Sequence, residues 1–249
     1  DVYKRQMPRL SRNAADGDDK AVVHDLTMGT KLTFIALLPI IVFMTALGPD
    51  IASALFAYGS FSDEAAYTLG LTISAAAFTL IPYALVMLHL RVFYAREEAW
   101  TPTFIIAGIT GTKIALSMLA PTIASEPGHV VILLGAANGF GFVAGAIIGA
   151  LLLRRKLGTL QFREVLRTSL WAIGASAVGV AAVFGVRWLL RDIAGLHLPE
   201  ALGRMIGAPS LGSLIEIALL GVLFLIVTGV VLSRSGLPEV QNLSLIHIS

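Results

Sequence analysis

One lysine near the middle of a long apolar segment is the residue best placed to do chemistry. Lys113 lies eleven residues from either end of the segment 102–124. A cation at the centre of a membrane-spanning helix costs about 2.5–3.5 kcal/mol on insertion scales. Thr110 and Ser117 fall on the same helical face, so the three polar side chains form a stripe. This pattern indicates a cation that faces a wet cavity and meets an anionic headgroup or phosphate. The alternatives are a lysine paired inside a helix bundle and a span whose true centre is shifted.

Four other ionisable residues lie at the ends of apolar segments. Glu216 begins the last segment, and we expect an interfacial, solvated carboxylate there, with proton coupling as the alternative. Arg187 and Arg191 end the preceding segment, and we expect them to be interfacial, with contact to a polar headgroup as the alternative. His89 has no partner at metal-ligand spacing, so no metal site is predicted.

The sequence carries no enzyme signature. There is no Gly-rich phosphate loop with its Lys-Ser/Thr, no HExxH pair and no GxSxG elbow. The chain has no cysteine, which excludes disulfides, thiolate metal sites and cysteine nucleophiles. We therefore predict no catalytic residues, no cofactor and a function other than that of an enzyme.

The composition indicates that lipid, rather than water, surrounds most of this chain. Of its 249 residues 56% are apolar and 14% are charged, and the mean hydropathy is +0.82, whereas a soluble domain is about one-quarter charged. The net charge of +2, without a block of like charges, argues against nucleic acid as a partner. The sequence predicts an all-α integral membrane protein.

Six segments are apolar enough to be membrane spans, each of which needs about 20 residues. We expect a break at Gly48-Pro49 in the first of them, with residues 51–58 extending it, and kinks at or near Pro39, Pro82 and Pro121. The predicted spans are 32–47, 66–90, 102–124, 130–153, 170–190 and 214–232.

Glycines recur every four residues in the fourth predicted span. Gly135 and Gly139 form one such pair, and Gly141, Gly145 and Gly149 form a series. Small residues at this spacing let another helix backbone approach closely, which matters where lipid removes the usual hydrophobic drive. The pattern favours helix packing, with a flexible gate as the alternative.

Basic residues gather on one side of the predicted membrane. The positive-inside rule therefore places both termini in the cytoplasm. The other side has only Arg187, Arg191 and Arg204. The cytoplasmic side collects twelve basic residues: Arg9, Arg12, Lys20, Lys31, Arg91, Arg96, Arg154, Arg155, Lys156, Arg163, Arg167 and Arg234.

The order of the segments suggests an internal organisation. Residues 1–6 (DVYKRQ) and 243–249 (LSLIHIS) are typical of translated sequencing-adapter tails, and we exclude both from fold reasoning. Residues 7–153 hold the first four spans, 170–232 a terminal helix pair and 233–242 a cytoplasmic tail. Basic and apolar residues interleave over 154–169, which predicts an amphipathic connector on the inner leaflet. Arg96-Glu97-Glu98 is expected to be a short solvated turn.

One stretch of the sequence has Gly48-Pro49 followed by Phe56, Tyr58, Gly59 and Phe61, and a second stretch has Arg91, Phe93, Tyr94, Thr101 and Pro102. Together the two stretches resemble the GP…LFxYGxF and RxFYAxxxxxTP segments of one family, the MurJ/MviN lipid II flippases. The opening Pro8-Arg9-Leu10-Ser11 and Pro39 fit the same family pattern. The resemblance runs over roughly residues 7–240.

The resemblance implies the C-terminal part of a transporter of about fourteen helices, built like MATE exporters of the MOP superfamily. Its substrate would be the undecaprenyl-linked peptidoglycan precursor, moved from the inner to the outer leaflet of the bacterial cytoplasmic membrane by alternating access. The terminal pair would line a groove for the undecaprenyl tail, and the energy would come from membrane potential or an ion gradient. The partners implied are the lipid bilayer, the missing N-terminal helices of the same chain and cell-wall synthesis proteins.

The resemblance does not supply an anion site. The arginines thought to hold the pyrophosphate in the family lie mainly on earlier helices, and none of those positions exists in this sequence. Lys113 matches no family motif known to be functional. Two alternatives therefore stay open: another MOP-superfamily exporter, of a polysaccharide-linked lipid or as a drug/cation antiporter, and a non-transporting membrane scaffold of cell-wall synthesis.

Overall fold

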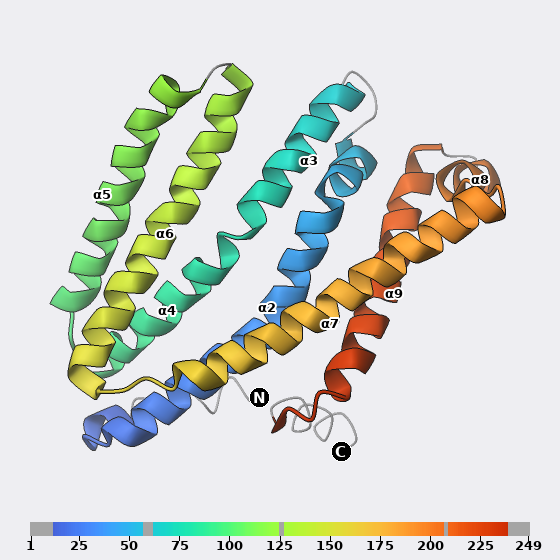
Figure 1. Cartoon of the computed structure of the whole chain (residues 1–249). Helices are drawn as coiled ribbons and strands as arrows, with labels where there is room; N and C mark the ends of the chain where they lie inside the picture. Colours follow the sequence, from blue (N-terminus) through green and yellow to red (C-terminus); the bar gives the residue numbers. More distant parts are fainter. Residues whose placement is uncertain (1–11, 57–61, 125–126, 207–208, 239–249) are drawn as a thin grey trace. The chain divides into compact units, whose positions relative to one another are not determined.

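The computed structural model describes residues 12–56, 62–124, 127–206 and 209–238, and within these residues the regular elements are helices (Figure 1). Residues 1–11 and 239–249 lie outside the described part, as do both predicted adapter tails. The helices are α2 (Asp19–Phe56), α3 (Asp63–Ala77), α4 (Leu80–Ala95), α5 (Trp100–Ile123), α6 (Pro127–Leu157), α7 (Phe162–Trp188), the π-helix η1 (Leu189–Ile193), α8 (Leu198–Ile206) and α9 (Pro209–Ser233).

The prediction of six membrane spans is confirmed. Within the described residues, six helical segments are long and apolar enough to cross a membrane. Each corresponds to one predicted span, and all six helical segments begin before the predicted apolar window. The third segment ends at Ile123, one residue short of the predicted end at 124. The six are Asp19–Phe56, Asp63–Ala95, Trp100–Ile123, His129–Leu157, Phe162–Ile193 and Leu211–Ser233.

The expected break at Gly48-Pro49 is wrong, because α2 runs without interruption from Asp19 to Phe56 and contains both Pro39 and Pro49. Proline removes one hydrogen bond from a helix ladder, but neighbouring helices can compensate for this loss in membrane proteins. The consequence is that Asp50 lies on a helix rather than in a loop.

The interruption instead lies in the second span, at Phe78-Thr79 between α3 and α4. A proline ring clashes with the carbonyl of the residue four positions earlier, and four positions before Pro82 is Phe78. Pro82 itself sits in the first turn of α4, where its missing N–H costs nothing. Pro82 therefore lies next to a boundary between two helices, rather than at a kink within one helix.

The helices form two compact units, which we describe separately. The first unit comprises the described residues within 1–37 and 78–169, and the second comprises those within 38–77 and 170–249. In the first unit, α6 packs against both α4 and α5. Its core includes the fully buried Val22, Val92, Phe93, Ile105 and Leu153.

The glycine series on α6 is a packing surface, as predicted. A Cβ atom at Gly145 would lie 2.4 Å from Ile109 Cγ1 of α5, and one at Gly149 would lie 2.7 Å from His89 Nδ1 of α4. Side chains from two helices therefore occupy the space that glycine leaves. Gly135 differs, because a Cβ there would meet nothing within 4 Å.

In the second unit, α2 crosses α3 at the Gly48-Pro49 pair. A Cβ atom at Gly48 would lie 2.1 Å from Ser74 Oγ, and one at Gly70 would lie 2.3 Å from Pro49 Cα. Only glycine permits this approach of two backbones. A small core of Leu47, Val183, Leu220 and Phe224 joins α2, α7 and α9 in the same unit.

The segment predicted as an amphipathic connector, residues 154–169, is not a separate helix. Its first residues complete α6, which ends at Leu157, and residues 162–169 already belong to α7. Gly158 has a φ of +82°, and its N–H donates to the Arg154 carbonyl. This left-handed glycine cap ends α6 and explains why the amphipathic pattern is divided.

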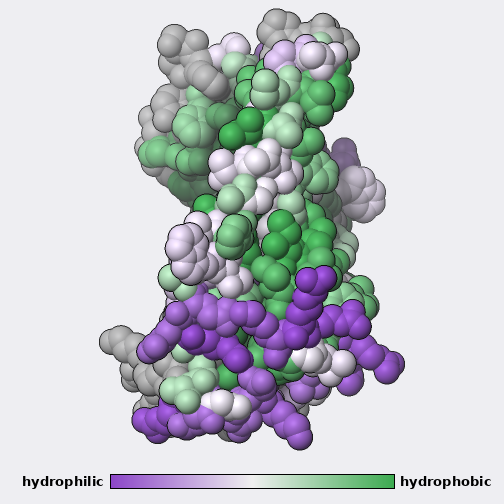
Figure 2. Space-filling model, turned by 90° about the vertical axis from the view of Figure 1, so that its left-hand side faces the viewer, coloured by the Kyte–Doolittle hydropathy of each residue, from purple (hydrophilic) through white to green (hydrophobic). Residues whose placement is uncertain are grey.

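The surface of the helices is largely apolar. Figure 2 shows one face on which apolar residues cover a wide area, while hydrophilic residues gather toward one end. Side chains of this size and exposure are covered by lipid or protein in a stable membrane protein. The large apolar side chains that are exposed along α5 include Phe104, Ile106, Ile114, Met118, Leu119 and Ile123.

Candidate functional site

The Lys113 side chain is half-buried between α5 and α6. Its Nζ lies 3.8 Å from the centroid of the Phe142 ring, which is a cation–π contact. Its stem covers Gly141, where a Cβ atom would lie 2.4 Å from Lys113 Cγ. Tyr83 of α4 packs edge-on against Phe142, with 5.0 Å between the two ring centroids. The ammonium group of Lys113 therefore lies on the Phe142 ring, which Tyr83 in turn supports.

Lys113 forms no ion pair with any residue that the structure describes. The alternative of a lysine neutralised by a carboxylate inside the bundle therefore has no support in this part of the chain. On the predicted stripe, Thr110 is exposed and Ser117 is half-buried. A charge held only by a ring face keeps its capacity for an anion, so the binding role of Lys113, Thr110 and Ser117 stays a prediction.

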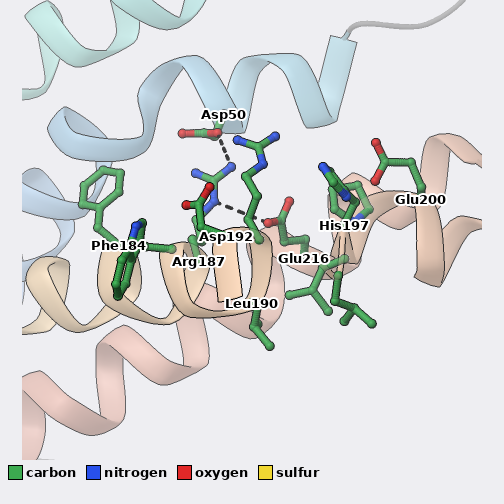
Figure 3. Close-up of a pocket in the computed structure, with 13 residues that line it drawn as sticks. Asp50, Phe184, Arg187, Leu190, Asp192, His197, Glu200 and Glu216 are labelled. Atoms are coloured by element: carbon green, nitrogen blue, oxygen red, sulfur yellow. Dashed lines mark ion pairs between the residues drawn. The ribbon is translucent and has the colours of Figure 1, made fainter. Parts of the chain in front are cut away.

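A second polar cluster joins three helices of the second unit. Arg187 Nη2 of α7 lies 2.9 Å from Asp50 Oδ1 of α2, and Arg187 Nε lies 3.4 Å from Glu216 Oε1 of α9. Figure 3 shows the guanidinium between the two carboxylates. The residue Glu216 is only 7% exposed. The expectation of a solvated Glu216 is therefore wrong, because the carboxylate is buried against Arg187. Its interfacial position stays a prediction.

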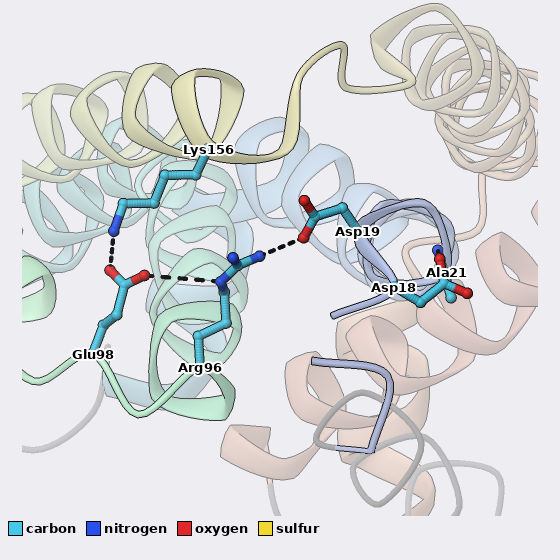
Figure 4. Close-up of polar contacts among 6 residues, drawn as sticks. All are labelled: Asp18, Asp19, Ala21, Arg96, Glu98 and Lys156. Atoms are coloured by element: carbon cyan, nitrogen blue, oxygen red, sulfur yellow. Dashed lines mark hydrogen bonds and ion pairs between the residues drawn. The ribbon is translucent and has the colours of Figure 1, made fainter. Parts of the chain in front are cut away.

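A third cluster occupies the turn between α4 and α5 in the first unit. Arg96 Nη1 lies 2.6 Å from Asp19 Oδ1 at the start of α2, and Glu98 forms an ion pair with Lys156 at the end of α6. Figure 4 shows this row of alternating charges from Lys156 through Glu98 and Arg96 to Asp19. The turn is more than a solvated loop, since its charges connect three helices.

Two opposing effects act on the Glu98 carboxylate. Burial raises its pKa, but hydrogen bonds from Lys156 and Thr101, together with the charges of Lys156 and Arg96, lower it further than burial raises it. The net result is a pKa below the ordinary glutamate value. Glu98 therefore stays ionised at neutral pH and keeps both of its cationic partners.

The fold accounts for only some of the six signature positions of the GP…LFxYGxF segment. Gly48 and Pro49 make the close crossing of α2 with α3. Phe56 is exposed at the end of α2. Tyr58, Gly59 and Phe61 lie outside the described residues.

The RxFYAxxxxxTP positions belong to the core and the charged turn of the first unit. Phe93 is fully buried, and so is Pro102 in the first turn of α5. Thr101 Oγ1 donates a hydrogen bond to Glu98 Oε2 at 2.9 Å. Arg91 is half-buried and Tyr94 is exposed, both near the end of α4. The motif therefore builds the turn that carries the charge row.

The family model described as lipid II flippase MurJ matches residues 3–196, which is most of the chain. The chain belongs to the MurJ family. The matched residues contain Lys113, both signature segments and the charge row, while α8 and α9 lie beyond them. A multi-span membrane transporter, rather than an enzyme, is what this family assignment supports.

Sequence reasoning missed two of the three polar clusters. A break at Gly48-Pro49 would place Asp50 outside the helix, so the predicted break conceals the pairing of Asp50 with Arg187. A usable signal was present: Asp50, Arg187 and Glu216 each stand near the end of an otherwise uncharged apolar run. Opposite charges in such positions are rarely left unpaired within a membrane.

Proposed function

We propose that this chain is the C-terminal part of a lipid II flippase, which moves undecaprenyl-linked peptidoglycan precursor from the inner to the outer leaflet by alternating access. The observation that carries the proposal is the match of the MurJ family over residues 3–196. Six apolar helices without an enzyme motif support a transport role in the bilayer. In this proposal α2 to α6 complete the second lobe, and α7 and α9 form the terminal pair that receives the undecaprenyl tail.

The proposal assigns Lys113 to the headgroup. Its ammonium rests on Phe142 without a carboxylate partner among the described residues, so it can offer its charge to a phosphate that passes the face of α5. Lysine binds phosphate as a point charge, and low dielectric strengthens the attraction. Thr110 and Ser117 would add hydroxyl contacts on the same face.

The proposal includes an orientation in the membrane. Twelve basic residues on one side of the spans against three on the other favour cytoplasmic N- and C-terminal segments in the bacterial inner membrane. The charge row of Asp19, Arg96, Glu98 and Lys156 would then lie at the cytoplasmic surface, and Asp50, Arg187 and Glu216 near the outer surface. Transport would draw on the membrane potential or an ion gradient.

Two other functions make different predictions. A related MOP-superfamily exporter would move a polysaccharide-linked lipid, drug or cation, and lipid II would then fail to compete with its substrate. A membrane scaffold of cell-wall synthesis would not translocate lipid at all. The family assignment favours the flippase over both, because its description names lipid II.

The reading frame around this sequence on a long native contig tests whether the chain is part of a larger transporter. The proposal expects about eight further spans upstream, with arginines inside the early ones to hold the pyrophosphate. That parent frame should restore growth to cells depleted of their own flippase. A stop codon and native start just before Met7 would leave a six-span protein without its anion site and would contradict the proposal.

A further inference from the structure

A pocket of about 400 Å³ lies in the second unit, where the end of α7, η1 and the start of α8 surround the ion-pair cluster. Arg187, with Asp50 and Glu216, belongs to its lining, and Figure 3 places His197 and Glu200 on the opposite side from Phe184. The volume lies within the range of cavities that hold small ligands.

The pocket lies at the level where apolar spans end. Its residues stand close to the last residue of the spanning segment on α2 (Phe56), close to the end of the segment on α7 and η1 (Ile193), and close to the start of the segment on α9 (Leu211). The hydrocarbon core gives way to the headgroup layer at such helix ends. Phospholipid headgroups are therefore the ligands present at high concentration beside this pocket.

Some charged side chains of the pocket form ion pairs with one another, and others do not. Arg187 is committed to Asp50 and Glu216. Arg191 of η1 and Glu200 of α8 also line the pocket and are exposed. Over the described ranges of the chain, neither Arg191 nor Glu200 forms an ion pair. Asp192 of η1 is a second exposed carboxylate of the lining that has no ion pair among the described residues. The cation Arg191 and the anions Asp192 and Glu200 therefore share the cavity without ion-pair partners in the described part of the chain.

The remaining lining favours a ligand with a positively charged end. The pocket holds four carboxylates, from Asp50, Asp192, Glu200 and Glu216, against the two arginines Arg187 and Arg191. An anion without a compensating positive group would meet this excess of negative charge. The exposed aromatic ring of Trp188 on the pocket wall adds a face that attracts an ammonium group.

The wall that carries Glu200 is held against α9. A Cβ atom at Gly212 would lie 2.0 Å from the Pro199 carbonyl oxygen, so the start of α8 rests directly on the α9 backbone. This contact fixes the position of Glu200 relative to Glu216. The family match ends at residue 196, so the α8 side of the pocket is a feature of this chain rather than of the matched region.

We propose that this pocket binds the headgroup of a zwitterionic phospholipid with a primary amine, of the phosphoethanolamine class. Arg191 receives the phosphate, and Glu200 accepts hydrogen bonds from the ammonium group beside Trp188. A choline headgroup carries the same charges but has no N–H to donate, and a glycerol headgroup has no positive end. The pocket therefore ranks ethanolamine above choline and choline above glycerol headgroups.

Trp188 provides a reporter inside the pocket itself. The chain has three tryptophans, at positions 100, 171 and 188. Trp100→Phe with Trp171→Phe leaves Trp188 alone, and Trp171→Phe with Trp188→Phe leaves Trp100 on α5 as a control outside the pocket. Each variant is placed in nanodiscs in which phosphatidylethanolamine, phosphatidylcholine or phosphatidylglycerol carries acyl chains brominated near the headgroup, in a background of the unbrominated competitors.

The expected result is an apparent affinity of Trp188 for phosphatidylethanolamine about threefold above that for phosphatidylcholine, because exposed ion pairs contribute little individually. Glu200→Gln should abolish this preference, and Arg191→Gln should weaken quenching by both lipids, since both carry the phosphate. The Trp100 control should show no preference. Equal quenching of Trp188 by all three lipids, a preference for phosphatidylglycerol, or an ethanolamine preference that survives Glu200→Gln would each overturn the proposal.

Discussion

Arg187 of α7 lies 2.9 Å from Asp50 of α2 and also contacts Glu216 of α9, so a single guanidinium neutralises carboxylates from two other helices. The two acidic residues are separated by 166 positions in the sequence, and the arginine is what makes their approach favourable. Breaking a pair of this kind leaves a charge that neither lipid nor the packed side chains can solvate.

Arg187→Gln should therefore destabilise the protein by about 2 kcal/mol, the cost of leaving a partly buried charged group without its hydrogen bonds. The midpoint of thermal denaturation in detergent measures this loss. Arg204→Gln, at an exposed arginine of α8, is the matched control and should have no effect. Combining Arg187→Gln with Glu216→Gln should recover part of the stability, and a double variant as unstable as the single one would contradict a charge-based role.

Gly145→Ala should destabilise the first unit by about 1–3 kcal/mol through overpacking against Ile109 and Val86. Gly135→Ala on the same helix meets open space, and there the better helix propensity of alanine should leave stability unchanged or raise it by up to about 1 kcal/mol. Denaturation midpoints of the two purified variants compare the two sites directly. Equal effects would show that the glycine series is not a packing surface.

Lys113→Ala in a full-length parent should reduce flippase activity about tenfold, the effect of losing about 1.4 kcal/mol of attraction to an anionic headgroup. Lys113→Arg keeps the charge and should retain most of the activity. Growth of flippase-depleted cells that express each variant is the measurement, with Lys20→Ala as a surface-lysine control and protein levels checked by immunoblot. Normal growth with Lys113→Ala at normal expression would remove Lys113 from the mechanism.

The lowered pKa of Glu98 predicts a stability that depends on pH. Because the folded-state pKa lies below the unfolded value, the ion pairs of Glu98 contribute fully above the ordinary glutamate pKa of about 4.3, and their contribution disappears as pH falls through the folded value. Glu98→Gln should lower stability at neutral pH by about 0.5–1 kcal/mol. The difference from the wild-type protein should shrink toward acidic pH, and a difference that stays constant would rule out this linkage.

The absence of cysteine allows a direct test of orientation. Ser62 and Thr159 are both exposed and lie outside the regular helices. A cysteine at position 62 should react with a membrane-impermeant maleimide in intact cells, and one at position 159 should react only after permeabilisation. The reverse labelling pattern would invert the proposed topology.

Hydropathy alone predicted the six spans, because a run of about 20 apolar residues has few stable alternatives to a membrane helix. The sequence also predicts that the glycine series on α6 is a packing surface, since its four-residue spacing places the glycines on one helix face. The sequence does not predict that Gly48-Pro49 is helical, because the tolerance of a helix for proline depends on neighbours such as α3 that local sequence does not reveal. For the same reason the cluster of Asp50, Arg187 and Glu216 required the fold, while the Lys113 stripe was visible but its aromatic partner Phe142 was not.

The central claim is that this chain belongs to a protein that moves lipid II across the membrane. The most direct test is the amount of lipid II reached by a modifying reagent added outside cells that lack their own flippase and express the full parent frame. The account predicts that outer-leaflet lipid II returns with the parent frame, and that it falls with Lys113→Ala but not with Lys113→Arg. Lipid II that stays inaccessible in cells with normal levels of the parent protein would contradict the flippase assignment.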